Sequence, residues 1–216
     1  MIGLRWIIVA VIFITSGCAN TPQIPLPLQQ VQSLKVTAIE VDYAPNSTIA
    51  WSDEEAAFAK SKGYVDAGSA VAEANATNKP SYEALVNSPE SKQHQKALLL
   101  PRVKAAFEKA LADKTTGTQA VKVVVTIKVM SASPAAQCGA IGGARWIEAT
   151  ASIVDAAGKK LATYDDLRGA AMCAGVINAG VLAAAISASQ GDPIDVLTSS
   201  MAENFKKWLT PKAGSG

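Results

Sequence analysis

AVKVVVTIKVMSA, the segment from Ala120 to Ala132, carries the strongest strand pattern in the chain. Its apolar and polar side chains alternate, and alternate side chains of a β-strand point to opposite faces of the sheet. The apolar positions are Val121, Val123, Val125, Ile127 and Val129, and the polar positions are Lys122, Thr126 and Lys128. One apolar face and one polar face are typical of antiparallel sheets. We therefore predict an antiparallel sheet with its core on one side.

Two further strands are predicted after this segment. The first, Arg145 to Asp155, alternates through Ile147, Ala149, Ala151 and Ile153. Asp155-Ala156-Ala157-Gly158 has the composition of a tight hairpin turn, and Lys160 to Arg168 returns as the partner strand. Together with the first segment, these strands are predicted to form an antiparallel meander.

A strand and a helix are predicted before the meander. Leu34 to Tyr43 is rich in β-branched residues, and Pro45-Asn46-Ser47 is predicted to end this strand. Pro101 suits the first turn of a helix, where its missing N–H costs nothing. The predicted helix runs from Pro101 to about Asp113. Its apolar stripe consists of Val103, Ala106, Phe107, Ala110 and Leu111.

Residues 44–97 are read as a helical insertion with weaker signals. A helix is expected from Ser52 until Gly63 stops it, and the alanine-rich stretch 65–76 is also expected to be helical. Residues 77–91 contain two prolines and little periodicity, which indicates a mobile insertion.

The C-terminal part contains two contrasting segments. Ala170 to Ala188 has no charged residue and repeats small residues, which favours a helix buried in the core over membrane insertion or pore lining. Asp192 and Pro193 then form a helix start, with the aspartate as the cap. The stripe of the last helix consists of Ile194, Leu197, Met201, Phe205, Trp208 and Leu209. The whole pattern predicts one α+β domain over residues 34–210, a mostly antiparallel sheet of about four strands with helices packed on one face.

The N-terminus has the layout of a bacterial lipoprotein signal over residues 1–17. Arg5 precedes an apolar run from Trp6 to Ile14, and small residues lie directly before Cys18. The run is too short for a spanning helix, which needs about 20 apolar residues. We predict cleavage before Cys18 and lipidation of its thiol, with an ordinary secretory signal as the alternative. Residues 18–33, rich in proline and glutamine, are expected to be a tether or a coil along the domain surface.

The remaining cysteines, Cys138 and Cys173, would then lie in an oxidising compartment, where an even pair suggests a disulfide. In the predicted meander both follow strand ends at the same edge of the sheet, so the topology permits the bridge. Two buried free thiols are the alternative.

No constellation of residues indicates a chemical reaction. The formal net charge of +2 gives no footprint for nucleic acid. His94, the single histidine, has no nucleophile or metal-ligand motif around it and is expected to be exposed and idle. Adjacent Asp165 and Asp166 face opposite sides of a regular strand and cannot share a proton without a bulge. The glycine loop from Cys138 to Arg145 lacks the lysine and the following helix of a P-loop. Trp146 is read either as a partner contact or as an aromatic that covers a sheet end. The sequence therefore assigns no catalytic, cofactor-binding or metal-ligating residue.

Three features carry a resemblance to a known family: the loop Gly139-Ala140-Ile141-Gly142-Gly143, the hairpin from Val154 to Ala162, and the small-residue segment before the final helix. From about Leu98 to Leu209 the chain resembles a family of small uncharacterised outer-membrane lipoproteins of Gram-negative bacteria. The signal segment also resembles enterobacterial lipoprotein signals, in which Ala19 in place of aspartate implies sorting to the outer membrane.

This resemblance implies a role in the cell envelope and carries over no catalytic residue. We expect a non-enzymatic lipoprotein on the periplasmic face of the outer membrane. It would be held there by the lipid on Cys18 and would bind a protein partner or support assembly. An accessory lipoprotein of a transport or secretion machine, oligomeric in that case, is the alternative, and a periplasmic hydrolase is the weakest reading.

Overall fold

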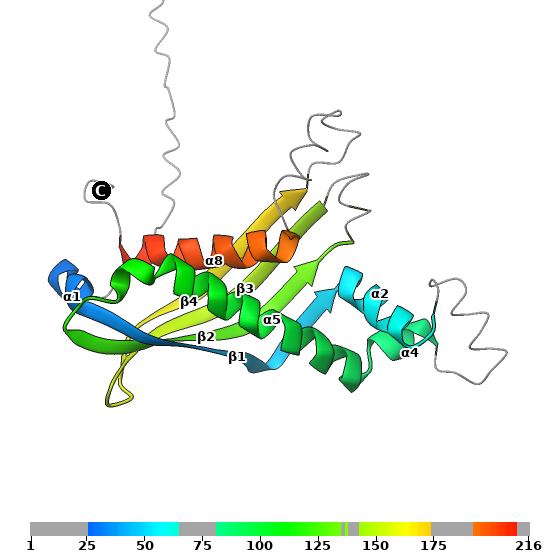
Figure 1. Cartoon of the computed structure of the whole chain (residues 1–216), viewed down its shortest axis with the longest axis horizontal. Helices are drawn as coiled ribbons and strands as arrows, with labels where there is room; N and C mark the ends of the chain where they lie inside the picture. The colour runs from blue at the N-terminus through cyan, green and yellow to red at the C-terminus, as the bar shows by residue number, and fades with distance from the viewer. Residues whose placement is uncertain (1–25, 65–80, 135–136, 138–142, 174–191, 211–216) are drawn as a thin grey trace, which may run out of the picture.

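The architecture is a four-stranded sheet covered on one face by helices (Figure 1). The computed structural model describes residues 26–64, 81–134, 137, 143–173 and 192–210. The strands lie in the order of the sequence: β1 (Leu34–Trp51), β2 (Gln119–Ala132), β3 (Gly143–Asp155) and β4 (Lys160–Cys173). The predicted α+β class and sheet size are therefore confirmed.

Strand pairing is mixed. β1 pairs with β2 in parallel, whereas β2 with β3 and β3 with β4 pair antiparallel, so the predicted meander is confirmed. Parallel neighbours need a long crossover, and the helical region between β1 and β2 provides it. This region contains α2 (Ser52–Ser61), α4 (Tyr82–Val86), α5 (Pro89–Ala110) and the short 3-10 helix η1 (Ala112–Lys114).

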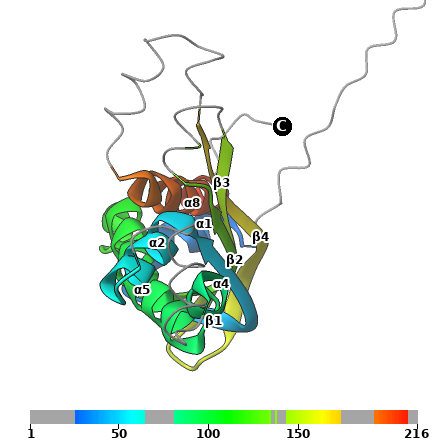
Figure 2. The same ribbon diagram turned by 90° about the vertical axis from the view of Figure 1, so that its right-hand side faces the viewer.

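The core lies between the sheet and two long helices, α5 and the C-terminal α8 (Pro193–Leu209) (Figure 2). The predicted stripes of both helices are buried, and so is most of the predicted apolar face of the meander. Asp192 caps α8 as predicted, because its Oδ1 accepts a hydrogen bond from the Ile194 N–H at 2.8 Å. The hairpin turn is also as predicted, since Gly158 has a φ of 84°, which favours glycine.

A bulge in β2 changes the expected alternation. Val121, Val123, Val125 and Ile127 are buried as predicted, but Val129 is only partly buried. The register with β3 shifts between Ile127 and Val129, so the extra residue moves the buried phase to Met130 and Ala132. The expectation for Val129 was wrong because a single inserted residue flips every later side chain.

β1 is longer than predicted. The strand does not end at Pro45-Asn46-Ser47 but continues to Trp51, after a register shift between Tyr43 and Thr48. β1 is an edge strand, and an edge or a bulge tolerates proline because no ladder hydrogen bond is required of its nitrogen. Figure 1 shows the strand bending between its two halves.

The long helix α5 begins earlier than predicted. Ser88 caps it by accepting a hydrogen bond from the Ser91 N–H at 3.2 Å, and Pro89 occupies the first turn. Pro101 therefore lies inside the helix, and residues 82–86 and 89–91, expected to be an irregular insertion, are helical. Leu99 and Val103 are fully buried on either side of Pro101, so packing holds the helix together across the proline.

Two further boundaries differ from the expectation. Residues 28–33 of the expected tether form α1 (Leu28–Ser33), and its Val31 is only 2% exposed. Residues 170–173, expected to open an uncharged helix, instead complete β4 because they pair with β3. The rest of that segment, and the alanine-rich stretch 65–76, lie outside the described residues.

Tyr43 links the edge strand to α5 beside the internal proline. Its Oη donates a hydrogen bond to the Lys96 carbonyl oxygen at 2.9 Å, and burial, with a contribution from Asp42, raises the pKa of the phenol. We expect Tyr43→Phe to lower the free energy of unfolding by about 1 kcal/mol, the usual contribution of one hydrogen bond. Urea denaturation of both proteins at neutral pH measures this difference. An unchanged midpoint would show that the hydroxyl contributes nothing.

Candidate functional site

The predicted lipidation and disulfide residues are only partly visible. Cys18 and Cys138 lie outside the described residues, whereas Cys173 is the last residue of β4 and pairs with Gly143. Ala132, at the end of β2, pairs with Arg145 near the start of β3. The ends of β2 and β4 and the start of β3 therefore share one end of the sheet, as predicted. The bridge between Cys138 and Cys173 stays a prediction.

This end of the sheet carries an arginine cluster, which consists of Arg102, Arg145, Asp192, Asp195 and Trp51. Arg102 of α5 donates from Nη1 to Asp192 Oδ2 at 2.6 Å and to Asp195 Oδ1 at 3.3 Å. Its guanidinium carbon also lies 5.5 Å from the centre of the Trp51 ring. The cluster thus ties α5 to the start of α8 and to the end of β1.

Arg145 is the buried member of the cluster, with a side chain only 6% exposed. Its Nε and Nη2 donate to the Ser133 carbonyl oxygen at 3.1 and 3.0 Å, and Nη2 lies 3.7 Å from Asp53 Oδ2. A guanidinium in such surroundings holds backbone and carboxylate groups in a fixed geometry. The next residue, Trp146, faces the other side of the sheet and is 39% exposed.

Electrostatics favour the charged form of Asp192. Burial alone would raise the pKa of its carboxyl, but the hydrogen bonds from Arg102 and the Ile194 N–H and the positive charges of Arg102 and Arg145 outweigh it and lower the pKa. The folded protein therefore binds this proton less tightly than the unfolded chain does. The stabilisation is complete above about pH 4, the ordinary pKa of an aspartate carboxyl. It is lost as the pH falls through the lower pKa that Asp192 has in the folded protein.

We expect Asp192→Asn to destabilise the protein at neutral pH by up to about 1 kcal/mol, because the pair is partly exposed to solvent. Asparagine also caps helices, so the variant removes the charge and keeps the cap. The difference from wild type should shrink between about pH 5 and pH 3, as measured by urea unfolding at each pH. Asp195→Asn, at the longer distance from Arg102, is the matched control with a smaller effect. A difference that stays constant with pH would contradict the assignment.

His94 is exposed, as predicted, and it makes a contact between two helices. Its Nε2 lies 2.9 Å from Glu54 Oε1, and its ring centre lies 5.5 Å from that of Phe58. The side chain is 42% exposed. A second pair between the same helices joins Lys92 Nζ to Glu55 Oε1 at 2.7 Å. The histidine therefore helps to attach α2 to α5.

Asp165 and Asp166 lie at a bulge. The register shift between β3 and β4 places both opposite Thr150, and both are exposed. The Asp165 carbonyl oxygen accepts hydrogen bonds from Lys128 Nζ at 2.7 Å and from Thr150 Oγ1 at 3.4 Å. These hydrogen bonds stabilise the sheet at the bulge, and their acceptor is the backbone carbonyl of Asp165, not its carboxylate. In the part of the chain that the structure describes, no group of three or more His, Cys, Asp or Glu side chains could hold a metal ion.

The arginine cluster was missed by sequence reasoning. Asp192 was identified as a helix cap, but nothing in the spacing of Arg102 and Asp192, which are 90 residues apart, indicates an ion pair. The comparisons give no further assignment, because no family model, no curated protein and no solved structure matches the chain. Among the described helices, none has both the length and the apolar character needed to cross a membrane.

Proposed function

We propose that the protein is a lipoprotein anchored to the periplasmic face of the outer membrane, with a non-enzymatic role in binding a partner or in envelope assembly. The observation that carries the proposal is the N-terminal pattern: Arg5, the apolar run from Trp6 to Ile14, and Thr15-Ser16-Gly17 before Cys18. This pattern combines the charged, apolar and small-residue regions of an export signal with a cysteine at the cleavage point.

The packing of α1 supports a short tether. Val31 and Leu34 are 2% and 1% exposed and belong to the main core, and Leu26 packs against the same core. The chain between Cys18 and Leu28 spans ten residues, which cannot exceed about 35 Å even when fully extended. A lipid on Cys18 would therefore keep the whole domain close to the membrane surface.

A tethered domain meets other envelope proteins at a high effective concentration without any additional contact. This favours a binding role, in which even a surface of modest affinity is useful. Trp146, one of two large apolar side chains exposed in the described residues, is the candidate partner contact that we propose on the sheet face opposite the helices.

The decisive experiment compares the wild type with Cys18→Ala after separation of inner membrane, outer membrane and periplasm. We expect wild-type protein in the outer membrane with a diacylated N-terminal cysteine by mass spectrometry, and the variant in the soluble periplasmic fraction or unprocessed. Cys173→Ala is the matched control, because it removes a cysteine that should carry no lipid. A mature N-terminus at any other residue, or a bare Cys18 thiol, would overturn the proposal.

A further inference from the structure

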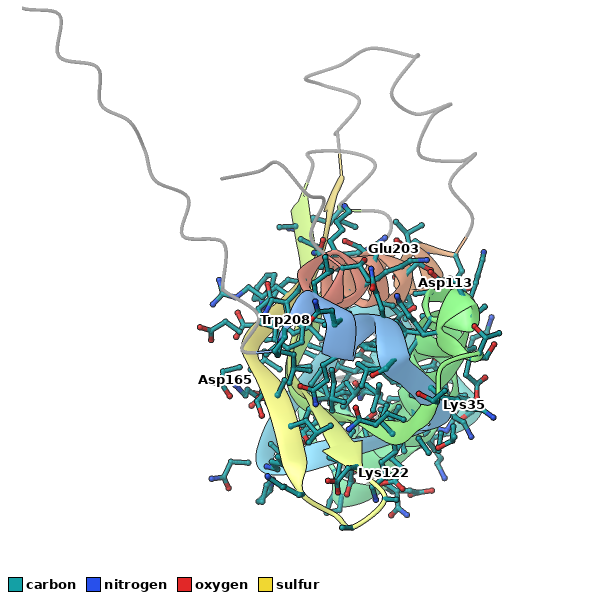
Figure 3. The ribbon with its side chains drawn as sticks, turned by 90° about the vertical axis from the view of Figure 1, so that its left-hand side faces the viewer. Lys35, Asp113, Lys122, Asp165, Glu203 and Trp208 are labelled. Carbon is teal, nitrogen blue, oxygen red and sulfur yellow. The ribbon has the colours of Figure 1, made fainter. Side chains whose placement is uncertain are left out.

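The described chain begins at one end of the molecule, beside α1, and Figure 3 shows this end facing the viewer. We name it the anchor-side end and define it by α1, Lys35 at the start of β1, η1, and the last turn of α8. The elements are fixed to one another: Leu34 pairs with Gln119 of β2, and Lys206 Nζ of α8 lies 3.1 Å from Asp113 Oδ1 of η1. The elements of the anchor-side end are therefore held in fixed positions relative to one another.

This surface combines an exposed apolar side chain with lysines. Leu28, at the first position of α1, is 56% exposed, although Val31 of the same helix is buried. Lys35 and Lys207 are exposed, Lys114 is half-buried, and Lys206 is paired with Asp113. Figure 3 labels two further exposed carboxylates on this side, Glu203 of α8 and Asp165 of β4. Four lysines thus share this side with three carboxylates, and two of the lysines are exposed.

We infer that the anchor-side end docks on a phospholipid surface that contains anionic headgroups. Leu28 enters the headgroup layer, and Lys35, Lys114 and Lys207 contact the lipid phosphates. This inference rests on the proposed lipid anchor at Cys18. Two observations favour a membrane over another occupant: the chain leaves this end toward the lipidation site within about 35 Å, and the excess of lysines is complementary to anionic lipid.

A surface of this size would bind a membrane weakly on its own. The tether favours the docked state, because a linker of about ten residues makes docking an intramolecular step. The effective concentration of the membrane surface is then in the millimolar range. Docking would also orient the domain. The ends of β2 and β4, the start of β3 and the start of α8 lie away from α1 in Figure 1 and would point away from the membrane.

The test uses the mature lipidated protein in vesicles of phosphatidylcholine alone, or of phosphatidylcholine with phosphatidylglycerol at about three to one. Amide hydrogen exchange is measured along the chain. In the anionic vesicles we expect the amides of α1 and the first residues of β1 to exchange at least about fivefold more slowly, the factor expected from one lysine near an anionic surface. High salt should abolish the difference, because salt screens these charges.

The combined variant Lys35→Glu, Lys114→Glu, Lys207→Glu should lose this protection. Lys60→Glu on α2 makes one such charge reversal away from the anchor-side end and should keep the protection. Equal exchange in both vesicle types, or protection at α2 in place of α1, would overturn the inference.

Failure of the anchor and failure of the docking can be told apart. Cosedimentation of the unlipidated Cys18→Ala chain with the same vesicles tests the surface without the lipid, at protein and lipid concentrations up to the millimolar range. Salt-sensitive binding that Leu28→Ser weakens would support docking even if mass spectrometry finds a bare Cys18. Absence of binding by this chain, together with unprotected α1 in the lipidated protein, would remove the docking and leave the anchor intact.

Discussion

Phe205→Ala should lower the free energy of unfolding by about 4 kcal/mol, because it opens a cavity where α5, α8 and the sheet meet. The Phe205 side chain is fully buried, and its ring centre lies 5.5 Å from that of Phe107 and 5.4 Å from that of Trp208. Trp208 in turn stacks on Tyr164 of β4 at 5.1 Å. Urea denaturation followed by circular dichroism measures the change, and a loss below about 2 kcal/mol would show that the site collapses without a cavity.

Phe58→Ala is the matched control, because it removes the same side chain from a separate cluster. Phe58 packs with Ala59, Tyr64, Leu85 and Val86, outside the main core. We expect this variant to accelerate hydrogen exchange in α2 and α4 while the main unfolding transition shifts much less than in Phe205→Ala. A shift as large as that of Phe205→Ala would mean that the two clusters unfold as one unit.

Local patterns predicted the meander and α8 well because their signals are complete within each element. The alternation of β2, the turn ending at Gly158 and the stripe of α8 each follow from side-chain period or turn chemistry. Asp192 and Pro193 marked the start of α8 in the same way. These elements needed no knowledge of their neighbours in space.

The errors arose where tertiary contacts override a local stop signal. Pro45 ended the predicted strand, but an irregular register lets β1 continue to Trp51 beside β2. Pro101 began the predicted helix, but burial of Leu99 and Val103 holds α5 together across it. The parallel pairing of β1 with β2 depends on the crossover, which local periodicity does not reveal.

The candidate site was less predictable than the fold. Arg102 meets Asp192, and His94 meets Glu54, only because helices distant in sequence pack together. Charged surface residues have no period that identifies their partners. Strand order predicted a shared sheet end for Cys138 and Cys173. The ends of β2 and β4 do lie at one end of the sheet, and Cys138 itself lies outside the described residues.

Gly169→Val should destabilise the protein by about 3 kcal/mol, because α8 packs directly on the backbone of β4. A Cβ at Gly169 would overlap the Leu197 carbonyl oxygen and would lie 2.8 Å from Met201 Cβ and 2.9 Å from Met201 N. Two of these atoms belong to the helix backbone, so α8 itself must move. Displacement of α8 should also weaken the contact between Arg102 and Asp192, so the variant should lose the acid-dependent part of its stability.

The matched control is Ala170→Val, which places the same valine side chain one residue later in β4. Ala170 is exposed on the opposite face of the sheet, and valine suits a strand, so the unfolding midpoint should change by less than about 0.5 kcal/mol. Urea denaturation of the two variants at neutral pH and near pH 4 gives both readouts. Equal stability of the two variants would show that α8 does not rest on β4 at Gly169.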